Sequence, residues 1–120
     1  ALVLIPGWRD LVGPPIEQIV ARQWAITTRS IVDTLGDMPA DRWRAVRYGD
    51  LLASPQAEIE HVCAWADWRW GRPFQAELPL SRYTISKPDP RKWEKHSAQI
   101  ESVLQLFQEQ ERRAEMLLNR

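Results

Sequence analysis

The sequence has almost no cysteine, since Cys63 is the single thiol. One cysteine cannot form an internal disulfide or supply a multi-cysteine metal site. A charge excess of either sign is also lacking, because 16 basic side chains are balanced by 16 acidic ones. Binding to nucleic acid needs a basic excess or a clustered basic stripe. The composition therefore gives no reason to expect a nucleic-acid partner.

Long hydrophobic runs are absent as well. The longest apolar run, residues 1–5, is far shorter than the ~20 residues that span a bilayer. It also lacks the charged start and the cleavage pattern of a signal peptide. We therefore expect a cytoplasmic protein without a membrane partner. The chain contains no metal-ligand cluster, nucleophile motif or glycine-rich phosphate loop, so we predict neither a metal site nor a catalytic residue within it.

Tryptophan, in contrast, is abundant, with seven residues in 120. Large aromatic side chains bury much surface each, so some of them can form a core while others face structure outside the chain. The apolar run that starts at Ala1 resembles a strand entered midway. We therefore predict that residues 1–120 form a single partial domain, which is one portion of a larger domain.

Helical periodicity is strongest in residues 16–35. Apolar residues recur there at steps of three and four, which predicts one buried stripe on a helix: Ile16, Ile19, Val20, Trp24, Thr27, Ile31 and Leu35. Gly36 is expected to end this helix. A last helix is expected to begin with Ser97 as its cap, either continuous or broken near residues 108–110 into two shorter pieces.

The centre of the chain predicts a strand followed by a helix. Residues 45–48 form a short β-like run, in which Ala45, Val46 and Tyr48 are apolar or aromatic, and Gly49 and Asp50 follow as a break. Ser54 and Pro55 then suit the cap and the first position of a helix, on which Cys63 is expected to be buried. In α/β sheets, ligands bind beyond the carboxyl ends of the strands. Tyr48 and Asp50 would occupy that position.

A long connection follows, because residues 74–93 contain three prolines and no clear periodicity. Long loops of this kind are usually functional or disordered. Ser81, Arg82 and Lys87 give it a hydroxyl and two cations, which could close over an anion. A solvated basic loop explains the same composition equally well.

Two segments resemble a known family. Residues 46–66, VRYGDLLASPQAEIEHVCAWA, and residues 80–93, LSRYTISKPDPRKW, resemble the "RYEDL…DP…E" and "LSRYT…PDP.KW" segments of bacterial sulfotransferases. These enzymes transfer a sulfuryl group from 3′-phosphoadenosine 5′-phosphosulfate (PAPS) to an acceptor hydroxyl or amine. The resemblance covers most of the chain from Gly7 onward, with Gly49 in place of the family's glutamate.

The resemblance implies a fold and a set of donor-binding residues. The expected fold is the C-terminal part of a P-loop-like, three-layer α/β sulfotransferase, mostly helical in this portion with one or two short strands. Tyr48 would contact the nucleotide near its adenine. Lys87, followed by Arg82 and Ser81, would hold the 3′-phosphate of PAPS. Trp93 would pin the loop by packing, and Asp50 would hydrogen-bond the turn.

Other family features are missing. The chain lacks the phosphosulfate loop, the Arg and Ser pair for the 3′-phosphate, and the usual catalytic base of the front half. We therefore expect the chain alone to be inactive, with a missing N-terminal half or a partner subunit supplying these groups. The acceptor, a small molecule, glycan or peptide, cannot be read from this part. The alternative is a non-catalytic helical interaction module whose Trp-rich face buries a partner helix.

Overall fold

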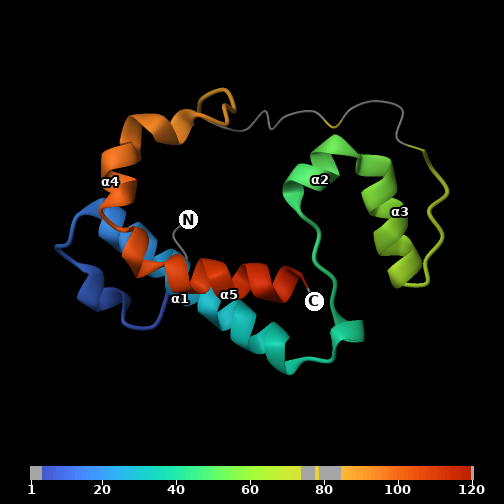
Figure 1. The fold of residues 1–120 in the computed structure, drawn as a ribbon, viewed down its shortest axis with the longest axis horizontal. Helices are drawn as coiled ribbons and strands as arrows, with labels where there is room; N and C mark the ends of the chain where they lie inside the picture. Colours follow the sequence, from blue (N-terminus) through green and yellow to red (C-terminus); the bar gives the residue numbers. More distant parts are fainter. Residues whose placement is uncertain (1–3, 74–77, 79–84, 120) are drawn as a thin grey trace. The chain divides into compact units, whose positions relative to one another are not determined.

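The computed structural model describes residues 4–73, 78 and 85–119 (Figure 1). Its regular elements are η1 (Trp8–Leu11), α1 (Ile16–Asp37), η2 (Ala40–Arg42), α2 (Tyr48–Ala53), α3 (Pro55–Trp65), η3 (Lys92–His96), α4 (Ser97–Glu101), η4 (Leu104–Leu106) and α5 (Gln108–Leu118). The chain divides into two compact units. Unit 1 comprises Ala1–Pro39 and Pro90–Arg120, and unit 2 comprises Ala40–Asp89.

The predicted α/β fold is wrong, because the described residues are helical and contain no strand. Residues 43–47 have no regular structure, and Tyr48 begins α2 instead of ending a strand. Gly49 and Asp50, expected to be a break, lie inside this helix. A strand needs a neighbouring strand to pair its amides and carbonyls, and the described chain offers none. Leu51 instead donates its backbone N–H to the carbonyl of Arg47 at 3.0 Å, a helical bond.

The second expected strand, residues 1–5, lies partly outside the described residues. Its last two members, Leu4 and Ile5, have no regular structure. Ile5 is nevertheless buried. Its side chain therefore contributes to the core from an irregular segment.

Unit 1 is organised by the pairing of α1 and α5. The two helices lie side by side in Figure 1. Trp24 of α1 contacts Phe107, just before α5, and Asp33, further along α1, pairs with Arg113 of α5. Both helices therefore run in the same direction. The predicted helix over residues 16–35 is confirmed, although it extends to Asp37 and includes Gly36.

The C-terminal segment is broken, as one of the two alternatives predicted, but the break lies earlier than expected. It spans residues 102–107 between α4 and α5 and contains η4, whereas residues 108–110, where it was predicted, begin α5. Val103 has φ −118° and Phe107 has φ −133°, far from the helical value near −63°. Short turn bonds replace the α-helical ladder, including the one from Leu106 N–H to the Val103 carbonyl at 2.9 Å. Ser97 is the first residue of α4, not its cap, which is His96.

Unit 2 contains α2 and α3, which meet at Ser54. Ser54 occupies the N-cap position of α3 and Pro55 its first turn, as expected, but the serine side chain makes no capping hydrogen bond. The expectation that Cys63 is buried on α3 is confirmed. No helix within residues 4–73 and 85–119 has both the length and the apolar character needed to cross a membrane.

The end of α3 is a Schellman motif. Trp68 donates its backbone N–H to the carbonyl of Cys63 at 2.7 Å, and Asp67 donates to that of Ala64 at 3.3 Å. Asp67 has φ 54°, in the left-handed region. Glycine is the usual residue there, because a side chain makes this conformation costly.

We expect the substitution Asp67→Val to lower the free energy of unfolding by about 1–2 kcal/mol, because a β-branched side chain strains the left-handed backbone. Asp67→Gly removes the charge without that strain, so we expect it to unfold at the same or a higher urea concentration. Urea unfolding followed by circular dichroism measures both. Equal midpoints for the two variants would contradict the motif.

Candidate functional site

The residues predicted to bind the nucleotide lie at the surface where they are described. Tyr48, the first residue of α2, is 67% exposed. Asp50 lies in the first turn of α2, where its charge favours the helix dipole, and not in the turn expected of it. Lys87 is exposed in an irregular segment before η3. Ser81 and Arg82 lie outside the described residues.

Neither Tyr48 nor Lys87 lines either of the two pockets described below. Trp93, expected to pin the loop, lies in η3 and is more than half exposed. The donor site stays a prediction, because Ser81 and Arg82 lie outside the described residues, and a cavity lined by other residues lies in unit 1.

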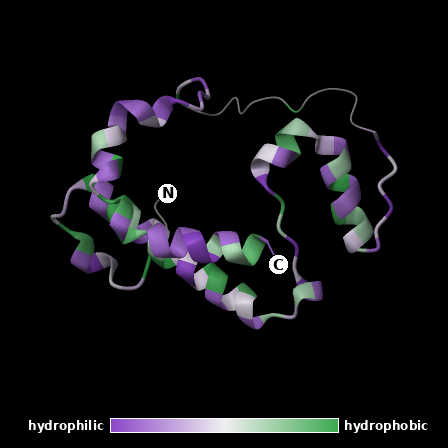
Figure 2. Ribbon diagram, in the orientation of Figure 1, coloured by the Kyte–Doolittle hydropathy of each residue, from purple (hydrophilic) through white to green (hydrophobic). Residues whose placement is uncertain are grey.

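That cavity is a groove of about 510 Å³ in unit 1, which we call the α1 groove. One wall comes from the N-terminal half of α1 and the other from the segment that runs from the end of η3 to the start of α5. The lining residues are Ile16, Glu17, Val20, Ala21, Trp24, His96, Gln99, Ile100, Val103 and Phe107. Figure 2 shows hydrophobic residues interspersed with hydrophilic ones along α1 and α5.

The groove exists because α1 projects apolar side chains at four-residue steps. Ala21, 4% exposed, gives a small buried floor. Ile16, Val20 and Trp24 stand beside it and remain 64%, 48% and 43% exposed. The stripe predicted to be core is therefore only partly covered. Its N-terminal half forms a wall of the groove.

An aromatic pair stands at one end of the groove. The ring centroids of Trp24 and Phe107 are 5.4 Å apart and the ring planes meet at 65°, an edge-to-face arrangement. Phe107 reaches this position from the break between η4 and α5. The pair thus links the middle of α1 to the start of α5.

The polar groups of the groove are few. His96 Nδ1 lies 3.2 Å from the Oε1 of Gln99. Glu17, in the first turn of α1, is the one residue of the lining that carries a formal charge at pH 7 with histidine neutral. Sequence reasoning gave His96 no role. The available signal was the sequence spacing of His96, Ile100, Val103 and Phe107. Steps of three and four residues predict that these side chains lie on one side of the chain.

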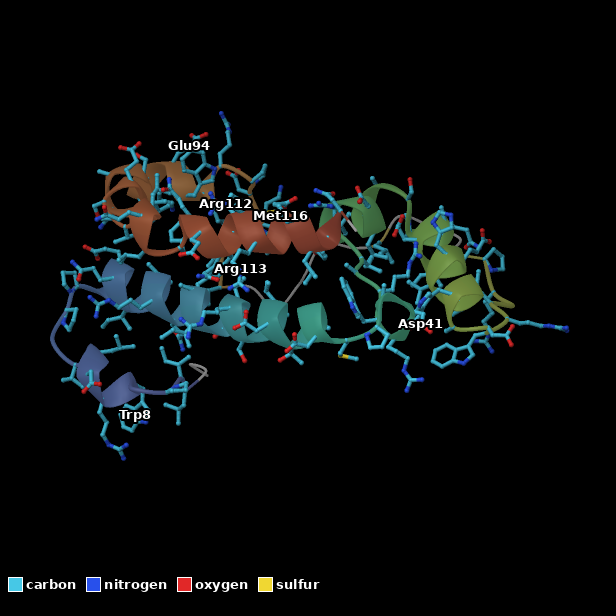
Figure 3. All side chains as sticks on the ribbon, turned by 60° about the horizontal axis from the view of Figure 1, so that its bottom comes forward. Trp8, Asp41, Glu94, Arg112, Arg113 and Met116 are labelled. Atoms are coloured by element: carbon cyan, nitrogen blue, oxygen red, sulfur yellow. The ribbon has the colours of Figure 1, made fainter. Side chains whose placement is uncertain are left out.

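A second pocket, of about 570 Å³, surrounds an ion pair between α1 and α5. Arg113 Nη2 lies 2.5 Å from Asp33 Oδ1, and Arg113 Nη1 donates to Gln110 Oε1 at 3.2 Å. Figure 3 shows Arg113 on the side of α5 toward α1, with Arg112 on the other side. Asp33 compensates the charge of Arg113. This pocket therefore lies between α1 and α5. The one cation in its lining, Arg113, is already paired with Asp33, so the pocket has no free positive charge for an anionic ligand.

Metal-ligating side chains are scattered. Within the described ranges, no group of three or more His, Cys, Asp and Glu residues lies close enough to hold an ion. Comparison of the chain with protein-family models, with curated proteins and with solved structures gives no match.

Proposed function

We propose that this chain is the C-terminal portion of a PAPS-dependent sulfotransferase and carries part of its donor-binding surface. The observation that carries the proposal is the pair of sequence segments, residues 46–66 and 80–93, which stand in the family's order. It does not depend on a strand before Tyr48. A tyrosine at the start of a helix can equally present its ring to a nucleotide.

The donor needs an aromatic surface for its adenine and positive charge for its phosphates. Tyr48 offers an exposed ring, and base–aromatic stacking contributes to binding without depending on base identity. Lys87 offers an exposed ammonium group as a point charge for the 3′-phosphate. Arg82 and Ser81 add a bidentate fork and a hydroxyl at that phosphate.

Catalysis requires groups beyond these. Negative charge on the transferring group and on the leaving phosphate must be stabilised in line with the acceptor. In this proposal, an N-terminal half or a partner subunit supplies the phosphosulfate loop and the base. The acceptor is a small molecule, glycan or peptide bearing a hydroxyl or amine. The enzyme acts in the cytoplasm, and this chain alone is inactive.

We expect Tyr48→Ala and Lys87→Ala, each made in the complete enzyme, to weaken binding of 3′-phosphoadenosine 5′-phosphate by about tenfold. The loss at Lys87 should be larger at low salt, because screening already weakens an exposed charge pair at high salt. Isothermal titration calorimetry measures both effects. Arg112→Ala removes an exposed cation from α5 and serves as the control. Unchanged affinity in both test variants would reject the site assignment.

A second candidate is the helical interaction module. It is favoured by Trp65, Trp68 and Trp70, which are exposed at and after the end of α3. Aromatic side chains of this kind are enriched at the centres of protein interfaces. The same titration on the complete protein discriminates. No heat with the nucleotide, together with a cooperative thermal melt of the isolated chain, favours the module.

A further inference from the structure

The α1 groove has the dimensions of a small-molecule site. Its volume of about 510 Å³ falls within the range of roughly 300–1,000 Å³ that is typical of such sites. Its lining is also typical, because apolar and aromatic side chains surround a few polar ones.

The carboxylate of Glu17 favours positively charged small molecules over anionic ones. Glu17 brings a carboxylate to a lining whose other polar side chains are His96 and Gln99, and no ion pair among the described residues involves it. The amides at the start of α1 favour an anion, but Glu17 itself already provides one there. A ligand carboxylate would meet a like charge. A ligand ammonium group would meet an opposite one.

The length of the ligand follows from the helix. Glu17 and Trp24 are seven positions apart on α1, which corresponds to about 10 Å along the helix axis. Val20 lies between them on the same wall. A matching molecule therefore carries its ammonium group at one end and an aromatic ring at the other, joined by a short apolar chain.

We propose that the α1 groove binds a small arylalkylamine, with its ammonium group at Glu17 and its ring beside Trp24 and Phe107. The apolar walls contribute affinity by removing the ligand from water. Glu17 contributes the preference for an amine. The site lies in unit 1 and shares no residue with the proposed donor site. The result of one test therefore does not decide the other proposal.

The test compares three probes of one shape on the complete protein by isothermal titration calorimetry. 4-Phenylbutylamine carries the ammonium group, 4-phenyl-1-butanol is neutral and 4-phenylbutyrate is an anion. We expect saturable binding of the amine, roughly fivefold weaker binding of the alcohol, and the weakest binding for the acid. Equal affinity for the three probes, or no saturable binding of the amine, would overturn the proposal.

Two variants in the groove and one control outside it locate the contact. Glu17→Gln should bring the amine down to the affinity of the alcohol and leave the alcohol unchanged. Glu101→Gln, which removes an exposed carboxylate of α4 outside the groove, should retain the preference for the amine. Val20→Arg should abolish binding of the amine, and Val20 is exposed enough for the arginine to reach solvent. An amine preference that survives Glu17→Gln would also overturn the proposal.

Discussion

Replacing Leu117 by alanine is expected to lower the free energy of unfolding by about 2–4 kcal/mol. Leu117 is 7% exposed on α5, and Val32 of α1 is equally buried in the same unit. The substitution removes apolar contacts and leaves a cavity between two helices that can close it only in part. Since domains are stable by only about 5–15 kcal/mol, this is a large fraction of the total.

The neighbouring residue provides a matched control. Met116 is 67% exposed, so Met116→Ala should change the free energy of unfolding by no more than about 0.5 kcal/mol. Urea unfolding followed by far-ultraviolet circular dichroism gives both values. Similar losses in the two variants would show that α5 does not pack against α1 through Leu117.

The second large effect is expected at the break between α4 and α5. Val103 is 5% exposed there and lines the α1 groove. Val103→Asp places an unpaired carboxylate at this buried position, and we expect a loss of about 3–4 kcal/mol in the free energy of unfolding. Ser102→Asp introduces the same group one residue earlier at an exposed position, and should be tolerated.

Thermal melts of these two variants give the comparison. The melting temperature of Val103→Asp should fall well below that of Ser102→Asp. If the two melting temperatures agree, Val103 is not buried and the described break does not form as a packed turn.

The sequence predicted α1 well because its apolar period persists over many turns. Residues 16–35 repeat at steps of three and four, and no other regular structure satisfies that spacing. A break in the last helix was one of two alternatives, although it was expected near residues 108–110 and lies at residues 102–107. The burial of Cys63 followed from its place on an apolar face. In each case the signal was local.

The strand before Gly49 was predicted wrongly because its signal was too short. A four-residue run that includes the charged Arg47 fits a strand or the start of a helix, and a strand also needs a partner. Glycine within a helix costs roughly 1 kcal/mol relative to alanine, so Gly49 argued against α2. α2 forms nevertheless and contacts α3, although none of its residues is buried. Such a contact is not visible in a local pattern.

The α1 groove was not predicted from the sequence, for a related reason. Each wall has a signal in the sequence. Ile16, Val20 and Trp24 follow helical spacing, and so do His96, Ile100 and Val103. The sequence alone does not show that these two sets of residues lie against each other in the fold. Pairing between segments so far apart is fixed by tertiary packing.

The discontinuity of unit 1 has a kinetic consequence. Its two segments, Ala1–Pro39 and Pro90–Arg120, flank the whole of unit 2 in sequence. Contacts between α1 and α5 can form only after the intervening chain has closed a long loop, and the entropy of that closure slows the encounter. A single proteolytic cut inside unit 2 would make the encounter bimolecular, so recovery from denaturant would then depend on protein concentration.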